Sequence, residues 1–510
     1  MMHEREKSDP CEVVRKPANK PGQPGAESVE RRQGAEGNAV ESRTCRTRSR
    51  ASVFQGLGRV RQAAKARKKE RFTALLHHVD VELLKAAYSW LKRDAAPGVD
   101  QLTWQQYGQD LEANVVDLHA RVHRGGYQAL PSRRCYIAKA DGRQRPLGIA
   151  ALEDKIVQRA LVEVLNAIYE GDFLGFSYGF RPGRSQHDCL DALAVGITRT
   201  KVNWILDADI GSFFDSLSHS WLMRFVEHRI GDPRVIRLIG KWLKAGVMED
   251  GEVTPTEEGT PQGAVISPLL ANIYLHYVFD LWAKRWRQRH ACGQVIFVRY
   301  ADDIVAGFEH EAEARCFMAD LRVRMEQFTL SLHPDKTRLI EFGRYAAGNR
   351  ARRGLGKPET FNFLGFTHIS GRSRKGGFQL KRKSRRDRMR AKLREIKETL
   401  RQRMHDPIPQ QGKWVGQVVR GYFNYHAVPT NAESLSAFRY HVTELWRRAL
   451  QRRSQRDRTT WARLTRLAAD FLPAPRILHP WPQARFAVTH PRWEPGARIA
   501  HAGICAGGAG

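Results

Sequence analysis

The stretch Tyr300-Ala301-Asp302-Asp303 places two adjacent carboxylates between two short apolar runs, Val295–Val298 and Ile304–Phe308. Apolar runs on both sides of a tight acidic turn predict a β-hairpin. Two like charges at a hairpin tip repel each other and add nothing to packing, but they become favourable around a multivalent cation. Few carboxylates beside apolar strands are typical of Mg²⁺, whose remaining ligands are phosphates. An acidic pair in a solvated turn is the plainer alternative.

A second acidic cluster lies 93 residues upstream (302 − 209), in the segment Trp204–Asp215, which reads WILDADIGSFFD. Here an apolar strand again runs into aspartates, and an aromatic pair follows. If this strand pairs beside the hairpin, Asp209 meets Asp302 and Asp303. Three carboxylates can hold two cations about 3.5–4 Å apart, an arrangement that serves nucleotidyl transfer. The sequence therefore predicts these three aspartates as catalytic residues that bind two Mg²⁺ ions.

The two clusters resemble motifs A and C of reverse transcriptases, with the patterns Asp-x-x-x-x-Phe and Tyr-Ala-Asp-Asp. Further blocks narrow the resemblance to the group II intron reverse transcriptase/maturase family, and they occur in that family's order between residues 54 and 490. The resemblance implies an α+β fold: a right-hand polymerase with fingers and a palm built on an antiparallel sheet, followed by an α-helical thumb/maturase domain. The further blocks are KADGRQRPLGI (139–149), YGFRPGRS (178–185), GTPQG (259–263), SPLLAN (267–272), HPDKT (333–337) and FNFLGF (361–366).

Composition and the resemblance together predict the organisation of the chain. Residues 1–50 lack Phe, Trp and Tyr and cannot bury enough apolar surface to offset their chain entropy. The predicted segments are a disordered basic tail (1–53), an N-terminal helical extension of the fingers (54–130), reverse transcriptase fingers and palm (131–366), a thumb/maturase domain (367–472) and a short C-terminal tail (473–510). Periodicity predicts helices over 58–90, 104–124, 154–168, 267–287, 311–329, 411–426 and 433–452, and hairpins around 141–142 and over 361–366.

Lys139 and Arg145 flank the predicted hairpin at Asp141-Gly142. In the family, the matching pair holds the triphosphate of the incoming dNTP, and the physics agrees. Cations on a flexible hairpin can close over three phosphates, and an arginine can bind them bidentately. Two exposed basic side chains with no ligand are the alternative.

Phe214 lies five residues after Asp209, and the resemblance implies that it lies under the sugar and excludes a 2′-hydroxyl. Core packing is the alternative role, which Phe213 could provide equally well. Asp207 and Asp215 are then spectators, or groups that tune the metal ligands.

Two further site residues come from the resemblance. Gln262 lies in a glycine-flanked loop that lets backbone approach a ligand closely, and its family counterpart contacts the incoming nucleotide or the template. Lys336 corresponds to a lysine near the family's active site that protonates pyrophosphate. A turn signal and a surface lysine are the respective alternatives.

A formal net charge of +31 and a pI near 10.2 indicate a polyanionic partner. Residues 371–460 alone hold 24 Lys and Arg against 7 Asp and Glu, a net charge of +17. Within them Met389, Leu393, Ile396 and Leu400 recur at helical spacing, so one apolar stripe carries a basic outer surface that can follow a phosphate backbone. This segment is similar to the family's thumb/maturase domain. The candidate RNA-binding residues are Arg385, Arg386, Arg420, Arg447 and Arg448.

Seven cysteines form no C-x-x-C pair, which argues against a zinc site or a disulfide framework and fits a reducing compartment. No run of about 18 apolar residues predicts a membrane span, and the N-terminus lacks an apolar signal core. We therefore expect a cytoplasmic protein with no membrane partner. Longer family members carry an endonuclease domain with paired cysteines. Its absence predicts that this protein does not cut the second DNA strand itself.

The sequence predicts an RNA-directed DNA polymerase encoded by a group II intron, which also acts as a maturase. The expected partners are group II intron RNA, an RNA template with a DNA primer, dNTPs and target DNA. One alternative is a non-intron reverse transcriptase of the retron or diversity-generating type, which lacks the maturase segment. Another is a polymerase-inactive RNA-binding splicing factor, against which the three aspartates argue. An RNA-dependent RNA polymerase is disfavoured by Phe214.

Overall fold

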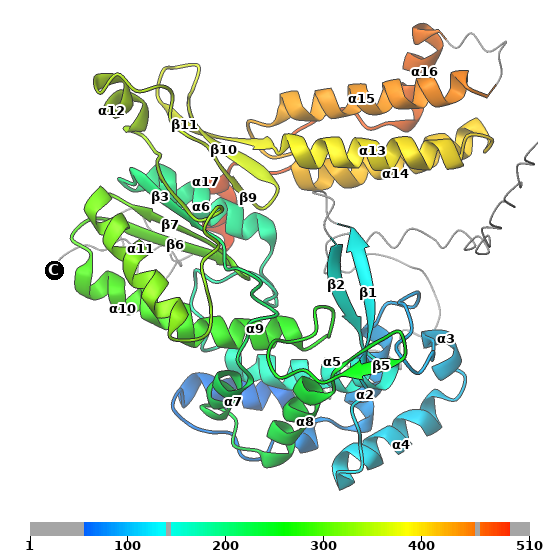
Figure 1. Cartoon of the computed structure of the whole chain (residues 1–510). Coiled ribbons are helices and arrows are strands. Elements are labelled where there is room, and N and C mark those ends of the chain that lie inside the picture. The colour runs from blue at the N-terminus through cyan, green and yellow to red at the C-terminus, as the bar shows by residue number, and fades with distance from the viewer. Residues whose placement is uncertain (1–55, 139–143, 454–459, 490–510) are drawn as a thin grey trace, which may run out of the picture. The chain divides into compact units, whose positions relative to one another are not determined.

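The computed structural model describes residues 56–138, 144–453 and 460–489 (Figure 1). Lys139 and the predicted tail over 1–53 lie outside the described residues. Both acidic clusters belong to one antiparallel sheet with the strand order β6-β7-β3-β8, which we call the carboxylate sheet. The predicted strand before Asp209 and the predicted hairpin are therefore confirmed. The strands are β3 (Trp204–Ala208), β6 (Val295–Tyr300), β7 (Asp303–Phe308) and β8 (Arg338–Glu341).

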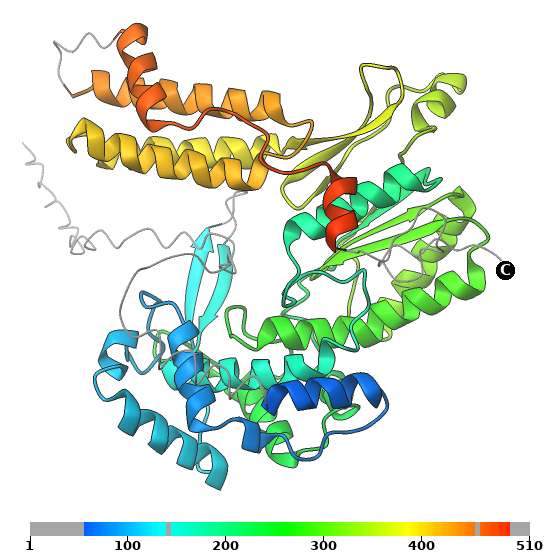
Figure 2. The same ribbon diagram turned by 180° about the vertical axis from the view of Figure 1, so that it is seen from behind.

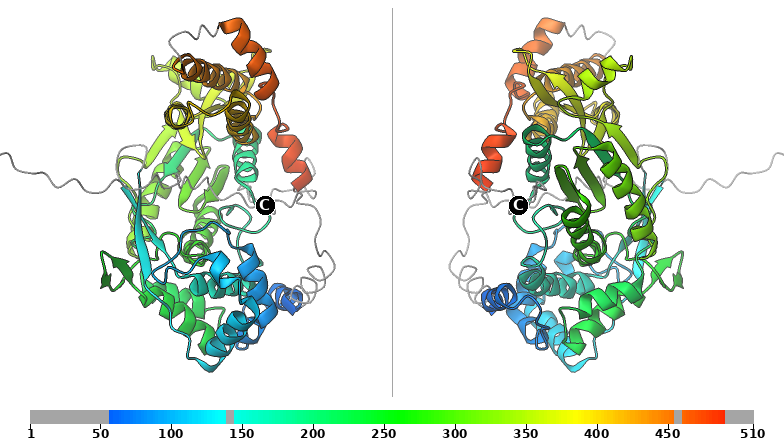
Figure 3. Two further views of the ribbon diagram at one scale, coloured as in Figure 1. Left: turned by 90° about the vertical axis from the view of Figure 1, so that its right-hand side faces the viewer. Right: turned by 90° about the vertical axis from the view of Figure 1, so that its left-hand side faces the viewer.

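Both faces of the carboxylate sheet are covered, which explains its continuous apolar runs. Val295 and Phe297 pack into one core cluster with α10 (Leu281–His290) and α11 (Glu311–Glu326), whereas Ile296 and Val298 pack into another with α6 (Gln186–Arg199). Alternate residues of a strand point to opposite faces. Figure 3 shows α6 on one side of the strands and α11 on the other.

The helix predicted over 267–287 is confirmed, with one irregularity. It runs as α9 (Ser267–Leu275), a π-helical turn η2 (His276–Asp280) and α10. Such turns occur inside longer helices and often at functional sites. Here the turn ends at Asp280, whose fully buried carboxylate lies behind the carboxylate sheet hairpin. Helices α5 (Leu152–Tyr169) and α11 confirm two other helix predictions.

The single helix predicted over 58–90 is wrong, because the chain breaks it in the middle. The buried Asp232 carboxylate accepts hydrogen bonds from the backbone amides of Leu75 (2.8 Å) and Leu76 (3.0 Å). In an uninterrupted helix those amides would bond four residues back. The periodicity predicted which residues are buried. It could not show that the distant Asp232 accepts hydrogen bonds from the backbone amides of Leu75 and Leu76. The observed elements are a helix over 56–66, η1 (Leu76–His78) and α2 (Val81–Trp90).

The helix predicted over 104–124 is also interrupted. Thr103 and Gln106 form a reciprocal capping box that starts a short helix, and Gly108 ends it. Two helices therefore replace the predicted one. They are α3 (Trp104–Tyr107) and α4 (Leu111–Arg124).

A second four-stranded sheet has the order β2-β1-β4-β5. Its first two strands pair antiparallel and confirm the hairpin predicted around 141–142, although residues 139–143 themselves lie outside the described part. Its strands are β1 (Ser132–Ala138), β2 (Gln144–Ile149), β4 (Val247–Glu249) and β5 (Glu252–Thr254), and the helices α7 (His219–Glu227), α8 (Pro233–Lys244) and α12 (Ala346–Arg352) complete this half of the chain.

The hairpin predicted over 361–366 is confirmed, and a third strand joins it in the order β11-β10-β9. Its two-residue turn is Leu364-Gly365, with φ of 44° and 79°, as a type I′ turn requires. The predicted helices beyond it are also present. The elements are β9 (Phe361–Phe363), β10 (Phe366–Arg372), β11 (Phe378–Ser384), α13 (Arg386–Gln402), α14 (Ile408–His426), α15 (Ala432–Gln451) and α16 (Trp461–Phe471).

The described part of the predicted tail contains one more helix, α17 (Pro482–Thr489). It packs against α6, as Figure 2 shows, and Phe486 is buried in the core cluster on that face of the carboxylate sheet. Among the described residues, no helix combines the length and the apolar character that crossing a bilayer requires.

Candidate active site

Strand pairing sets the positions of the three aspartates. Strands β3 and β7 are antiparallel with Ala208 opposite Ile304, so the next residues along, Asp209 and Asp303, lie at the same end of the sheet. In the neighbouring pair, β6 and β7, the ladder ends with Tyr300 opposite Asp303, which leaves Ala301 and Asp302 in the turn. The structure thus brings together the three aspartates that the sequence singled out.

The electrostatics of this cluster call for a cation. Burial and the neighbouring carboxylates of Asp302, Asp209 and Asp207 raise the pKa of Asp303 to about 7. Burial and the Asp209 carboxylate also raise the pKa of Asp302. Burial raises the pKa of Asp207 to about 6, and Asp209 adds to the rise. Like charges that are taken out of water hold on to protons unless a positive charge joins them.

A lysine supplies one such charge. Lys336 Nζ donates to Asp209 Oδ2 at 2.7 Å, so the structure places this predicted site residue at the aspartates. Among the described residues, no three His, Cys, Asp or Glu side chains are arranged to hold a metal ion as they stand. The hard carboxylate oxygens nevertheless fit Mg²⁺ in chemistry, and Lys336 would compete with such an ion for Asp209.

The hairpin tip is held from behind by a buried arginine that sequence reasoning missed. Arg299 donates to both carboxylate oxygens of Asp280 (2.7 and 2.6 Å), and its Nη1 donates to Asn272 Oδ1 (3.0 Å). The same Nη1 also donates to the carbonyl of Ala301 in the turn, at 2.9 Å. The sequence did contain an indication of this role, because Arg299 lies inside the apolar strand VIFVRY. A fully buried charge needs an oppositely charged or hydrogen-bonding partner.

The block YGFRPGRS supports the same turn through a glycine. A Cβ atom on Gly179 would lie 2.3 Å from the backbone nitrogen of Ala301, so only glycine allows this approach. Asn272 Nδ2 donates to the Gly179 carbonyl at 2.7 Å. Residues of the blocks YGFRPGRS and SPLLAN therefore position the turn.

Three polar side chains link β2 to the loop GTPQG. Arg145 Nε donates to Gln262 Oε1 at 2.8 Å, and Gln262 Nε2 donates to the two oxygens of Asp215 at 3.1 and 3.2 Å. The structure thus joins two predicted nucleotide-binding residues through one amide. It also gives Asp215 a specific partner, which the sequence did not indicate.

The two aromatic residues after Asp209 have different environments. Phe213 is buried, with 2% of its surface exposed, whereas Phe214 is half-buried at the edge of the core. Their rings meet edge to face at 5.3 Å. The backbone of the GTPQG loop lies against Phe214, since Thr260 N donates to its carbonyl at 2.8 Å. The core role thus falls to Phe213, and Phe214 keeps an accessible face.

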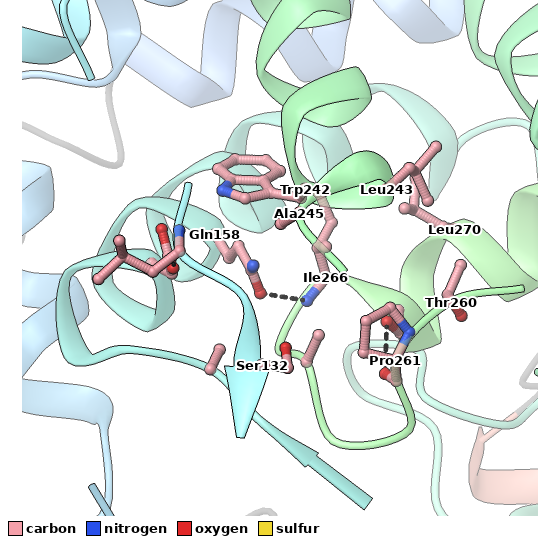
Figure 4. A pocket seen from close by; sticks show the side chains of 14 residues that line it. Ser132, Gln158, Trp242, Leu243, Ala245, Thr260, Pro261, Ile266 and Leu270 are labelled. Atoms are coloured by element: carbon pink, nitrogen blue, oxygen red, sulfur yellow. Dashed lines mark hydrogen bonds between the residues drawn. The ribbon is translucent and has the colours of Figure 1, made fainter. Parts of the chain in front are cut away.

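Behind the same loop lies a small cavity of about 20 Å³ (Figure 4). Gln158 Oε1 accepts from Ile266 N across it (3.4 Å), and Ser267 Oγ donates to the Pro261 carbonyl (3.1 Å). The buried hydroxyl of Thr260 has no protein partner among the described residues. A cavity of this size holds about one water molecule, so it supports the loop and is no nucleotide site.

The candidate RNA-binding arginines fall into two groups. Arg386 and Arg420 are exposed and form no ion pair with any described residue. Arg385 pairs with Asp387 at 2.6 Å, and Arg447 and Arg448 both pair with Glu444. Sequence reasoning also missed Arg388 on α13, whose charge opposes the rise in the pKa of Asp303.

Comparison with known proteins matches the central part of the chain to a family of polymerases. The family model for "Reverse transcriptase (RNA-dependent DNA polymerase)" matches residues 137–368. Over 315 residues the chain is 35% identical to Protein YkfC of Escherichia coli K12. The aligned region covers 55% of this chain and 77% of that protein.

Two intron-related proteins match shorter stretches. Group II intron-encoded protein LtrA of Lactococcus lactis subsp. cremoris is 42% identical over 153 residues, which is 30% of this chain and 25% of LtrA. Nuclear intron maturase 2, mitochondrial, of Arabidopsis thaliana is 30% identical over 110 residues, or 21% and 15% of the two chains. The matched reverse transcriptase domain and these relatives show that the chain belongs to the family of group II intron reverse transcriptases and maturases.

Proposed function

We propose that this protein is an RNA-directed DNA polymerase encoded by a group II intron and that it also acts as a maturase. The observation that carries the proposal is the pairing of β3 with β7, which puts Asp209 beside the Asp302-Asp303 turn. The raised pKa values of Asp302 and Asp303 support a site built for cations. An RNA-binding protein without polymerase activity would have no use for such a cluster.

The proposed architecture is that of a right hand. The carboxylate sheet with α6, α10 and α11 forms the palm, and the β2-β1-β4-β5 sheet with the N-terminal helices forms the fingers. Helices α13–α16 form the thumb and maturase domain. The proposed boundaries are residues 131–366 for fingers and palm and 367–472 for the thumb, with 54–130 as the extension of the fingers.

Asp209, Asp302 and Asp303 would hold two Mg²⁺ ions, which when bound lower the pKa of the primer 3′-hydroxyl and stabilise the leaving pyrophosphate. Arg299 fixes the turn that carries two of these aspartates, so the ligands need little reorganisation before they act. Lys336, which contacts Asp209, would give a proton to the pyrophosphate.

The nucleotide is proposed to bind between β2 and the GTPQG loop. Arg145, together with Lys139, neutralises the triphosphate, and Gln262 positions the nucleotide or the template base. The hydrogen bonds from Arg145 to Gln262 and from Gln262 to Asp215 orient the side-chain amide of Gln262. The Asp215 carboxylate can only accept, so it faces the amide nitrogen, and the amide oxygen faces Arg145. The accessible face of Phe214 then meets the sugar and leaves no room for a 2′-hydroxyl.

The proposed maturase function needs basic surface and no further catalytic group, because a group II intron catalyses its own cleavage. Arg386 and Arg420 are available for phosphates, and Arg385, Arg447 and Arg448 can exchange their carboxylate partners for phosphates. The proposed partners are intron RNA, a primed RNA template, dNTPs and target DNA.

The decisive experiment is the double variant Asp302→Asn with Asp303→Asn. We expect DNA synthesis on a primed RNA template to fall by at least about 100- to 1,000-fold, as when a main electrostatic group of an active site is removed. Binding of intron RNA should stay unchanged. The amides keep the side-chain volume and remove like charges, so the melting temperature should not fall.

Asp94→Asn, an exposed carboxylate in a turn, serves as the matched control and should polymerise like the wild type. Normal DNA synthesis by the double variant would show that the aspartates are not the catalytic residues.

A further inference from the structure

Two large aromatic side chains are stacked on the outside of the C-terminal helices. Tyr440 on α15 and Trp461 at the start of α16 have 58% and 40% of their surfaces exposed. Their rings lie 5.8 Å apart with an angle of 11° between the planes. Single exposed aromatic residues need no explanation, but this stacked pair holds two partly exposed rings in a fixed mutual orientation.

An arginine held by a carboxylate lies over the Trp461 ring of this aromatic pair. The Arg447 guanidinium lies 5.1 Å from the centre of the Trp461 ring. Glu444 holds it through two hydrogen bonds of 3.2 Å, and also accepts from Arg448 Nε at 2.8 Å. The planar cation is therefore positioned before any ligand arrives, which lowers the entropy cost of binding.

Beside the aromatic pair, α13 and α15 border a groove of about 320 Å³. Leu393 and Leu445 give it an apolar lining, and Arg394, Lys397 and Arg448 add three cations against the one carboxylate of Glu444, which pairs with Arg448. Arg394 and Lys397 are exposed and form no ion pair with a described residue. The volume lies within the usual range for small-ligand sites, about 300–1,000 Å³.

We propose that this face, defined by Tyr440, Trp461, Arg447 and the α13–α15 groove, binds an unpaired segment of RNA. Unpaired bases stack on aromatic rings and on arginine planes, and the groove cations lie where the adjoining phosphates run. A duplex hides its base faces and cannot use the aromatic pair. The inference rests on the proposed function in one respect, namely that the polyanion bound by this domain is RNA.

The test uses the full-length protein saturated with a primer–template duplex, so that the polymerase site is filled. A fluorescein-labelled 12-nucleotide oligoadenylate and a 12-base-pair RNA duplex are then titrated separately. We expect Tyr440→Ala and Trp461→Ala each to weaken oligoadenylate binding by about 5- to 100-fold and to change duplex binding less than about twofold. Tyr440→Phe should bind as the wild type does, because it keeps the ring.

Tyr345→Ala, which removes another exposed aromatic side chain (51% exposed), is the matched control and should bind both probes normally. Unchanged oligoadenylate affinity in both aromatic variants overturns the inference. An equal loss for oligoadenylate and duplex also overturns it, because the effect is then not stacking. Primer extension by the same preparations separates the outcomes, since failure of the proposed function removes DNA synthesis from the wild type itself.

Discussion

At the scale of single residues, the neighbouring phenylalanines 213 and 214 differ only in where the backbone points them. Phe213 is buried in the core, whereas Phe214 is half-buried at its edge. Spacing alone favoured Phe214 as the residue that excludes a 2′-hydroxyl, but could not show that Phe213 was already committed to packing. Burial assigns the packing role to Phe213, because a fully buried ring cannot also meet a ligand, and the role of Phe214 stays a prediction.

Phe214→Ala should reduce the preference for dNTPs over rNTPs by at least about tenfold, since removing the ring opens space for the 2′-hydroxyl. Single-nucleotide incorporation on a primed RNA template measures both rates. Phe213→Ala should instead lower the melting temperature, because deleting a buried phenylalanine costs about 3–5 kcal/mol. An unchanged dNTP preference in Phe214→Ala would remove that residue from the nucleotide site.

Lys336→Gln should strengthen Mg²⁺ binding. The ion pair with Asp209 is half exposed and contributes about 1 kcal/mol or less, so its loss should improve the Mg²⁺ affinity by up to about fivefold. Isothermal titration calorimetry measures that affinity without any reaction. If Lys336 also gives a proton to pyrophosphate, kcat should fall while the affinity rises.

Lys357→Gln, an exposed lysine elsewhere on the chain, should leave both the Mg²⁺ affinity and kcat unchanged. Weaker Mg²⁺ binding by Lys336→Gln would mean that the lysine does not compete with the ion for Asp209.

At the scale of secondary structure, Asp232 shows how one side chain ends and starts elements. It caps α8 by accepting from Arg234 N at 3.0 Å, and it takes the amides of Leu75 and Leu76 that keep the preceding segment from continuing as a helix. Burial disfavours its ionisation, but the hydrogen bonds from Leu75, Arg234 and Leu76 outweigh burial and lower the pKa of Asp232 to about 2.

Asp232→Ala should destabilise the protein at pH 7 by about 2 kcal/mol, the value of a pKa lowered from 3.8 to about 2. A carboxyl group with a lowered pKa stabilises the fold above its unfolded pKa and loses that effect as the pH falls. The difference between wild type and variant should therefore shrink as the pH falls from about 4 towards 2.

Thermal unfolding at pH 7, 5, 4 and 3 measures this difference. Asp80→Ala removes a single capping bond to Leu83 N and should cost about 1 kcal/mol. A larger loss of stability in Asp80→Ala than in Asp232→Ala would contradict the assignment.

Secondary structure was predictable where it depends on local pattern. The hairpin 295–308, helices α5 and α11, and helices α13 to α15 follow from periodicity and turn residues. The helices expected over 58–90 and 104–124 were wrong because the first is broken at Leu75 by Asp232, 157 residues away, and the second ends early at Gly108. Amphipathic spacing survives such a break, so the sequence could not reveal it.

At the scale of the whole molecule, one aspartate joins three distant segments. Asp191 on α6 is buried and pairs with Arg382 on β11 (3.0 Å) and with Arg485 on α17 (3.3 Å). The chain between these residues spans almost 300 positions (485 − 191 = 294). The pairs tie both the β9–β11 sheet and the last described helix to the helix behind the carboxylate sheet.

Asp191→Ala should lower stability by about 3–5 kcal/mol, because it leaves the buried Arg382 without its counter-charge. Differential scanning calorimetry and limited proteolysis of the segment around α17 report the loss. Glu433→Gln, which breaks the exposed pair with Lys383, should leave the melting temperature unchanged. A wild-type melting temperature in Asp191→Ala would show that the three segments do not depend on this residue.

The sequence by itself determined the family, the order of its blocks and the basic helices that follow, and it predicted which aspartates carry the chemistry. Local spacing and residue type are sufficient for these. Only the tertiary structure decided how the site is held, through Arg299 and Asp280 behind the turn, Gly179 against Ala301, Asp215 on Gln262, and Lys336 on Asp209. Those contacts join residues far apart in the chain, and no local pattern specifies which distant side chain a buried charge will meet.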